Sequence, residues 1–359
     1  MSEVLRYFIA CNSGLTVLRS KGRGFEELGR SFSGLTLEYI TGCRETPEIL
    51  FAAVAFDGGY RSQDGGISWT KVLNGDVRTF TVDPHDEQIV YAGSGPVCLY
   101  QSEDKGLTFH ELGSFVDQPQ KVKEQWTVPA TYSGKVPPHI RHIYIHPEKR
   151  DFIYVLLEHG GVIRSLDGGR KWEDVSNGID YLDMHIIANL PGDFDRYYVS
   201  SARGFFRTDD GGGNWYRVEN GMPYEYTEYY SYSHEWLFCE GPRGRPRMVL
   251  GGGKGSPGFW AREQMTPHGH ILISDDEGRS WRNSTNLPID MPYMPWTFVS
   301  HPENPEVLFC GMGDGARGFG MAPDKRGVGA FYRSNDRGES WDCIMPDLPS
   351  VLTAWVSIN

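Results

Sequence analysis

The sequence predicts an all-β protein folded as one seven-bladed β-propeller domain over residues 1–359. Two observations carry this prediction. A turn motif, Ser/Thr-x-Asp-x-Gly-x-x-Trp/Phe, recurs six times, and a similar succession of strand-like segments precedes each copy. A composition with 44 Gly and 13% aromatic residues is typical of many short strands joined by tight turns. The repeats therefore indicate one ring of similar units and not two unrelated domains.

Each copy of the motif has the chemistry of a folded hairpin turn. Its short Asp accepts hydrogen bonds from nearby backbone N–H groups, its Gly supplies a positive φ, and its last aromatic residue packs back between strands. The six copies span residues 62–69, 102–109, 165–172, 208–215, 274–281 and 334–341. We expect their aspartates to be structural, neither catalytic acids nor calcium ligands.

The segments around the motifs supply four strands for each blade. Residues 77–84 predict a first strand that ends at a Pro-marked turn, residues 88–93 a second, and one further strand lies on each side of the motif. The chain ends supply a seventh blade, because residues 7–28 give only three strands and residues 352–357 form an orphan strand. We expect this C-terminal strand to complete the N-terminal blade and close the ring.

The repeated motif resembles the Asp-box (BNR) repeat of the sialidase-like and photosystem II stability/assembly-factor-like superfamily of β-propellers. The resemblance implies that each box closes the turn between the third and fourth strands of a blade, on the rim remote from the ligand face. The F/Y-R-I-P segment of sialidases is absent, and the length suits one propeller, whereas related xyloglucanases use two. The resemblance therefore predicts a scaffold and no particular reaction.

Charge and composition exclude several classes of function. A formal net charge of −12 without a basic stripe argues against nucleic-acid binding and against anionic membrane surfaces. The N-terminus lacks a basic segment followed by an apolar run, so we expect no export signal. Six scattered cysteines without a C-x-x-C pair predict free thiols, which is typical of a cytoplasmic protein.

Insertions point to the functional face. Motif-to-motif distances are 40, 63, 43, 66 and 60 residues, so three blades carry about 20 extra residues. These extra segments lie at roughly 113–138, 252–269 and 312–329, in connections that share one rim of a propeller. We therefore expect three long loops to crowd one mouth, opposite the motif turns.

Histidines gather at the same predicted mouth and suggest a metal site. Neutral imidazoles are good ligands for divalent transition metals, and three or four ligands leave positions for water or substrate. The spacing of His268 and His270 puts both side chains on one side of a strand if the strand has begun there. The predicted metal ligands are His139, His234, His268 and His270, and the predicted ion is Zn, Mn or Fe.

Other side chains at this mouth are candidates for catalysis and substrate binding. The predicted general acids or bases are His142, His159, His185 and Glu235. Arg, Trp and Tyr side chains can hold an anionic or hydroxyl-rich molecule through forked hydrogen bonds and ring stacking. The predicted substrate-binding residues are Trp126, Arg141, Trp260, Arg262 and Arg317.

Three functions are consistent with these residues. The leading hypothesis is a metal-assisted hydrolase or lyase acting on a small polar or anionic, saccharide-like substrate. The second is a noncatalytic propeller that binds a protein or a glycan. The third is a metal-free glycosidase that uses two carboxylates. Carboxylates available for that reaction are Glu38, Glu158, Glu228, Glu235 and Asp314.

Overall fold

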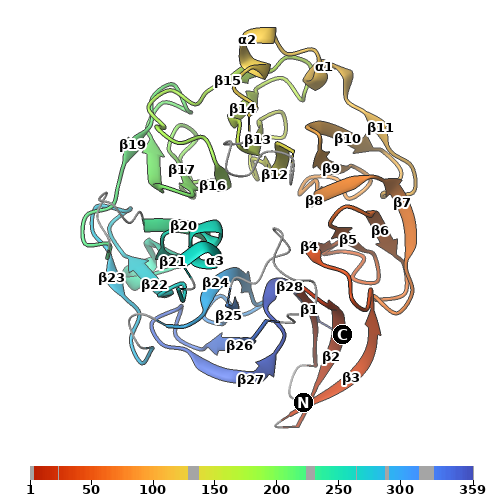
Figure 1. Cartoon of the computed structure of the whole chain (residues 1–359), viewed down its shortest axis with the longest axis vertical. Coiled ribbons are helices and arrows are strands. Elements are labelled where there is room, and N and C mark those ends of the chain that lie inside the picture. Colours follow the sequence, from red (N-terminus) through yellow and green to blue (C-terminus); the bar gives the residue numbers. More distant parts are fainter. Residues whose placement is uncertain are drawn as a thin grey trace.

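The chain folds into a ring of seven β-sheets around a common axis (Figure 1). The computed structural model describes residues 4–22, 24–127, 137–223, 231–263, 265–287, 291–314 and 327–358. Within these residues, the strands form seven antiparallel sheets of four strands each. This arrangement confirms the predicted all-β, seven-bladed propeller.

The blades follow one another in chain order. The first blade combines β28 (Val351–Ile358), β1 (Leu5–Cys11), β2 (Gly14–Lys21) and β3 (Gly24–Ser31). The second and third comprise β4 (Leu37–Gly42), β5 (Leu50–Val54), β6 (Gly58–Ser62), β7 (Thr70–Asn74), β8 (Asp76–Val82), β9 (Val90–Gly95), β10 (Cys98–Ser102) and β11 (His110–Glu111). The fourth and fifth comprise β12 (His139–Ile145), β13 (Ile153–Glu158), β14 (Gly161–Ser165), β15 (Glu173–Asp174), β16 (Met184–Asn189), β17 (Tyr197–Ser201), β18 (Gly204–Thr208) and β19 (Tyr216–Arg217). The last two comprise β20 (Ser231–Glu240), β21 (Pro246–Lys254), β22 (His270–Ser274), β23 (Arg282–Asn283), β24 (Met294–Ser300), β25 (Leu308–Gly313), β26 (Gly329–Ser334) and β27 (Asp342–Leu348).

The C-terminal strand closes the ring as predicted. β28 pairs antiparallel with β1, from Leu5 opposite Ile358 to Cys11 opposite Val351. It also contacts β24 and β4, the innermost strands of the neighbouring blades. Because β28 fills this place, the first and last blades share one apolar core, which includes Tyr7, Phe309 and Val356.

The six predicted motif turns form by the expected hydrogen bonds. In the first, Ser62 Oγ donates to Asp64 Oδ1 at 2.8 Å and accepts from the backbone N–H of Gly66 at 2.9 Å. The N–H groups of Ile67 and Ser68 donate to Asp64 Oδ1. The hydroxyl–carboxylate bond recurs in the other five copies. These turns connect the third and fourth strands of their blades, so their aspartates are occupied in local structure.

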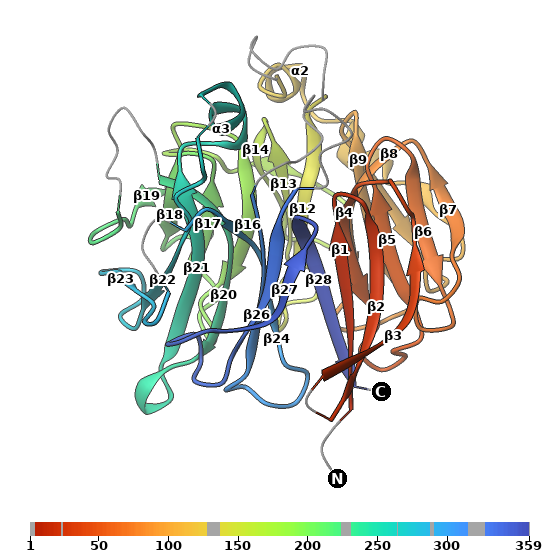
Figure 2. The ribbon, with the colours of Figure 1, turned by 60° about the horizontal axis from the view of Figure 1, so that its bottom comes forward.

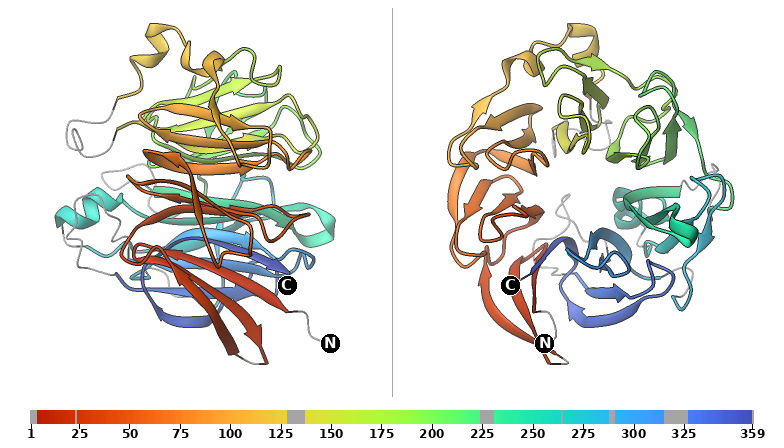
Figure 3. Two further views of the ribbon diagram at one scale, coloured as in Figure 1. Left: turned by 90° about the vertical axis from the view of Figure 1, so that its right-hand side faces the viewer. Right: turned by 180° about the vertical axis from the view of Figure 1, so that it is seen from behind.

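The two rims of the ring differ. The described parts of the insertions form α1 (Gly113–Val116) and α2 (Gln120–Lys123) after β11, and α3 (Pro257–Glu263) after β21. Figures 2 and 3 show α2 and α3 on one face and both chain ends toward the other. We call the face with the helices the insertion face. A 3-10 turn, Pro242–Gly244, joins β20 to β21. Residues 128–136 and 315–326 of the predicted long loops lie outside the described part.

The six cysteines, all of which are described, are free thiols, and Cys11, Cys43 and Cys310 are buried. Within the described residues, no helix is long and apolar enough to cross a membrane.

Candidate functional site

One β-bulge occurs on the innermost strand of every blade, close to the insertion face. On β4, for example, Leu37 pairs with Val54 and Tyr39 with Ala53, so Glu38 is the extra residue. The register shifts in the same way on the other six inner strands. The bulged residues, which we call the bulge ring, are Glu38, Arg78, Arg141, His185–Ile186, His234–Glu235, Trp296 and Leu352. Bulges redirect side chains and are common beside active sites.

Buried charges of the bulge ring form a network. Arg78 Nη1 lies 3.4 Å from Glu38 Oε1, and Arg141 Nη1 lies 3.6 Å from Glu38 Oε2. Arg78 also contacts Asp76 at 2.7 Å, and Arg141 Nε lies 4.0 Å from Glu158 Oε2. The side chains of Arg78, Glu38 and Arg141 are 2%, 6% and 7% exposed. Buried charges are tolerated when they pair in this way, so the network fixes the direction of Arg141.

A carboxyl–imidazole cluster adjoins Arg141. Glu158 ends β13, His159 begins the turn to β14, and Asp183 precedes β16 of the next blade. An isolated β-bridge pairs Glu158 with Asp183 and so holds the two blades together at this point. One potential ligand atom from each of Glu158, His159 and Asp183 lies within 4.8 Å of the other two. We call these three residues the carboxyl centre.

The two carboxyl groups of this centre differ in their readiness to ionise. Burial raises the pKa of Glu158, but the nearby His139, Arg141 and His159 outweigh burial and hold it well below its usual range. Burial, and next the charge of Glu158, raise the pKa of Asp183 well above its usual range. Burial lowers the pKa of His159, so its imidazole is neutral near pH 7. These surroundings therefore favour the ionised form of Glu158, the protonated form of Asp183 and the neutral form of His159.

Asp183 Oδ1 is buried without a hydrogen-bond partner in the described structure. Two imidazoles lie beside this carboxyl group: His185 Nε2 is 3.7 Å from Oδ1, and His159 Nδ1 is 3.9 Å from Oδ2. A buried oxygen acceptor without a donor is costly, and a cation or an additional proton would satisfy it. The donor set of two carboxyl groups and one imidazole suits a divalent metal ion.

The structure does not bring together the four histidines predicted as metal ligands. His139 Nε2 faces Glu158 Oε2 at 3.2 Å, and its Nδ1 faces the Pro137 carbonyl at 3.1 Å. Arg141 donates a hydrogen bond to His234 Nε2 at 3.0 Å, which occupies that lone pair with a cation. Among the described residues, only the carboxyl centre groups three metal-binding side chains this closely.

The His-Gly-His stretch lies at the start of the third strand of the sixth blade. β22 begins at His270, and His268 precedes it with a φ of +48°. The spacing of the two histidines predicted that both side chains would lie on one side of a strand. This arrangement does not form, because His268 lies before the strand begins. His270 Nδ1 lies 3.4 Å from the His268 carbonyl oxygen.

The residues predicted as acids or bases have different surroundings. His159 belongs to the carboxyl centre, and His185 lies beside it with Nδ1 2.7 Å from the Ser233 carbonyl. Burial, with a smaller contribution from Arg141, lowers the pKa of His142 to about 3, so His142 is a poor proton donor near neutral pH. Glu235 lines a cavity in the ring.

The residues predicted to bind substrate do not form one site. Arg141 lies between the carboxyl centre and this cavity. Trp126 stacks on Phe115 with ring centroids 6.1 Å apart. Trp260 is 3% exposed and packs against Tyr232 and Trp296, which gives it a place in the core. Arg262 falls on α3, and Arg317 lies outside the described residues.

Sequence reasoning missed Asp183 and the roles of Glu38 and Arg78. Asp183 stands two residues before His185, but its partner Glu158 is 25 positions earlier, so no local spacing links them. The adjacent pair Glu158–His159 was the one available signal. No sequence signal pointed to the buried role of Arg78, because a single Arg in a strand-like segment is usually solvent-exposed.

Comparison with known proteins agrees with the turn motif. The model of the BNR/Asp-box repeat matches residues 60–71. The same hydrogen-bonded turn is present in six blades. The chain is a seven-bladed β-propeller with Asp-box turns. A sequence search of the curated proteins finds no match.

Solved structures similar to this propeller include both enzymes and a peptide-bound protein. The GH74 xyloglucanase from Xanthomonas campestris superposes with a TM-score of 0.59 at 17% identity, covering 86% of this chain and 45% of its own. The GH74 enzyme from Niastella koreensis gives 0.62 at 15%, covering 94% and 47%. YCF48 bound to D1 peptide gives 0.54 at 15%, covering 86% and 81%. The propeller spans less than half of either GH74 chain, and these identities show the fold alone.

Proposed function

We propose that the propeller is a metal-assisted hydrolase or lyase whose reaction centre is Glu158, His159 and Asp183. The observation that supports this proposal most directly is the convergence of these side chains from two blades, with a buried Asp183 oxygen that lacks a hydrogen-bond donor. We propose Zn, Mn or Fe as the ion, in place of the four-histidine set suggested by sequence. The proposed substrate is a small polar or anionic, saccharide-like molecule.

Each residue at the carboxyl centre has a distinct proposed role. Glu158 is the ionised ligand, His159 offers a neutral imidazole, and Asp183 must lose its proton to become the third. A divalent ion at this site supplies Lewis acidity, which lowers the pKa of water or polarises a substrate carbonyl. His185, 3.7 Å from Asp183, is placed to accept a proton. Arg141 offers a substrate anion its guanidinium, held in place by Glu38.

Metal analysis tests the proposal. Tag-free protein purified without chelator is analysed by mass spectrometry for Zn, Mn and Fe, then titrated with each ion after EDTA treatment. We expect about one equivalent in the parent and its loss in Glu158→Gln and Asp183→Asn, two substitutions that preserve side-chain shape. The double variant His268→Ala/His270→Ala is the control and should keep the ion. Retention in the carboxyl variants with loss in the control would refute this ligand set.

The opposed pKa shifts favour a second candidate, a metal-free glycosidase. Two carboxyl groups whose surroundings drive their pKa values apart are suited to act as base and acid, here Glu158 and Asp183. This candidate predicts hydrolysis of nitrophenyl glycosides that is insensitive to EDTA and lost in Glu158→Gln. The noncatalytic alternative, binding of a protein or a glycan, predicts neither metal nor turnover.

A further inference from the structure

A cavity of about 510 Å³ lies inside the ring, beyond the bulge ring. Six of the seven bulges contribute to its lining: Glu38, Arg141, Ile186, Glu235, Trp296 and Leu352. The lining continues along β4, β24 and β28 to residues near their C-terminal ends, such as Arg44 and Ser357. We call this space the channel cavity. Its volume falls in the range of about 300–1,000 Å³ typical of small-molecule sites.

The channel cavity is separate from the carboxyl centre. Glu158, His159 and Asp183 are not among the described residues that line it. Arg141 is shared, since it lines the cavity and also approaches Glu158. Arg44 lines the cavity and, in the part of the chain that the structure describes, makes no contact with the carboxyl centre, so substitutions at Arg44 report on the cavity alone.

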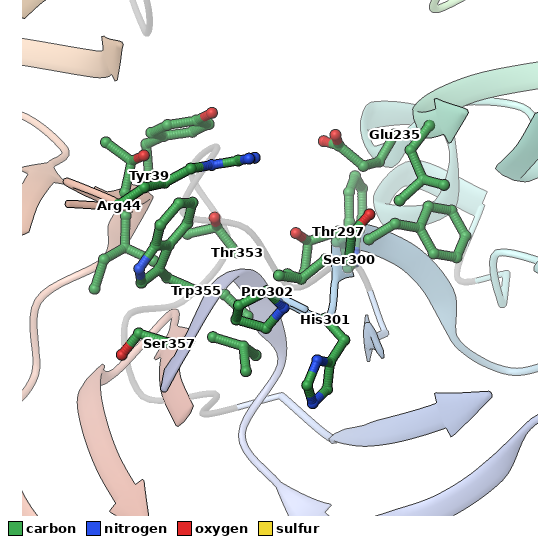
Figure 4. Close-up of a pocket in the computed structure, with 18 of the residues that line it drawn as sticks. Tyr39, Arg44, Glu235, Thr297, Ser300, His301, Pro302, Thr353, Trp355 and Ser357 are labelled. Atoms are coloured by element: carbon green, nitrogen blue, oxygen red, sulfur yellow. The ribbon is translucent and has the colours of Figure 1, made fainter. Parts of the chain in front are cut away.

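Arg44 gives the cavity an uncompensated positive charge. It follows β4, is exposed, and makes no hydrogen bond or ion pair within the described structure. Figure 4 shows its side chain directed into the hollow. By contrast, Glu38 is held between Arg78 and Arg141, so that carboxylate does not neutralise Arg44. A free guanidinium directed into a cavity suits a carboxylate or a phosphate.

The other residues that line the channel cavity near Arg44 indicate which further groups a ligand should carry. Tyr39 and Trp355 flank Arg44, and Glu235 points into the hollow from the opposite side (Figure 4). Both aromatic residues are half-buried and can pack against a ring. Glu235 is an acceptor, and Thr297 and Thr353 add hydroxyl groups to the lining. Glu303 also lines the cavity and is exposed to solvent.

We propose that the channel cavity binds a small ring-bearing anion that carries hydrogen-bond donors on the side away from its negative group. The anionic group pairs with Arg44, the ring packs beside the Arg44 guanidinium against Tyr39 or Trp355, and the donors reach Glu235. This polarity follows from the opposite charges on facing walls. It selects against neutral molecules of the same shape, because they leave Arg44 without a partner.

Binding of two matched probe pairs tests the proposal. The pairs are glucose 6-phosphate with glucose, and 4-hydroxyphenylacetate with 4-hydroxyphenylacetamide. Each charged probe has a neutral counterpart, and the two pairs separate a hydroxylated ring from an aromatic one. Dissociation constants are measured by ligand-observed NMR on EDTA-treated protein, so that no metal at the carboxyl centre contributes. We expect at least one anion to bind at about 1 mM or tighter, and about tenfold tighter than its neutral partner.

Substitutions at Arg44 decide whether binding occurs in the cavity. Arg44→Gln should remove the preference for the anion, and Arg44→Lys should keep part of it. Arg170→Gln, at an exposed arginine within the third motif turn on the opposite rim, is the matched control and should change nothing. The proposal is overturned if neither anion binds better than its neutral partner, or if Arg44→Gln leaves the preference intact. Neither result bears on the metal content that tests the carboxyl centre.

Discussion

Replacing Arg78 by Met should destabilise the propeller strongly through the buried charge network. The guanidinium contacts Asp76 at 2.7 and 2.9 Å and Glu38 at 3.4 Å, and Arg78 is 2% exposed. Met keeps much of the apolar stem but leaves Asp76 without its cation and Glu38 with Arg141 alone. Removing one partner of a buried pair costs about 3–5 kcal/mol, so we expect a loss of that size in the free energy of unfolding at pH 7.

Urea unfolding followed by the fluorescence of the ten tryptophans measures this loss. The double variant Arg78→Met/Asp76→Asn removes both charges and should recover part of the stability. A double-mutant cycle with Asp76→Asn should then give a coupling of about 1–3 kcal/mol. The reasoning is refuted if Arg78→Met costs under about 1 kcal/mol, or if the two single losses simply add in the double variant.

Three further predictions concern packing, the motif turns and pH. Gly93→Ala should lower the free energy of unfolding, measured by thermal unfolding, by about 1–3 kcal/mol, because the added Cβ would lie 2.5 Å from Ile140 Cγ2. Gly24→Ala is the control: its Cβ would meet nothing within 4 Å, so the substitution should change this free energy by under about 0.5 kcal/mol. Asp64→Ala should cost about 1–2 kcal/mol in urea unfolding through its lost turn hydrogen bonds, with metal content unchanged; a loss of metal would contradict a purely structural role. Because the folded pKa of Asp183 is raised, the unfolded chain gives up this proton first as pH rises above about 3.9, so the parent should lose stability between that pH and the folded pKa. Asp183→Asn should lack this loss, and parallel stability–pH curves for parent and variant would contradict the prediction.

The fold was predictable because its signals are local. Each motif turn is specified within eight residues by an Asp acceptor, a Gly with positive φ and an aromatic residue, and the structure forms the same hydrogen bonds in all six copies. Ring closure by residues 352–357 followed from counting strands, since an unpaired strand at one end matched a missing strand at the other. Each blade repeats the same order of strands and motif turn, so one sequence contains this pattern several times.

The candidate site was harder to predict because it depends on contacts between blades. Arg141 and His234 are 93 positions apart, and Glu158 meets Asp183 through a bridge between two sheets. Strand order predicts on which rim of the ring the histidines lie, but their partners decide what they can do. A guanidinium directed at His234 Nε2 makes this imidazole a hydrogen-bond acceptor, and that partner was not visible in the local sequence.

The bulges interrupt the alternation of side chains along the inner strands. In a regular strand, His139 and His142 would lie on opposite faces, because their spacing is three residues. The bulge at Arg141 changes this: His139 pairs opposite Glu158 and His142 opposite Leu156, two positions apart on β13, so both fall on one face. One extra residue also turns Arg141 toward Glu38 and the cavity. The same insertion in seven inner strands thus turns a repeated structural sheet into a ring of bulges that carry Glu, Arg, His, Trp and aliphatic side chains, and it is this ring that gives the scaffold its individual chemistry.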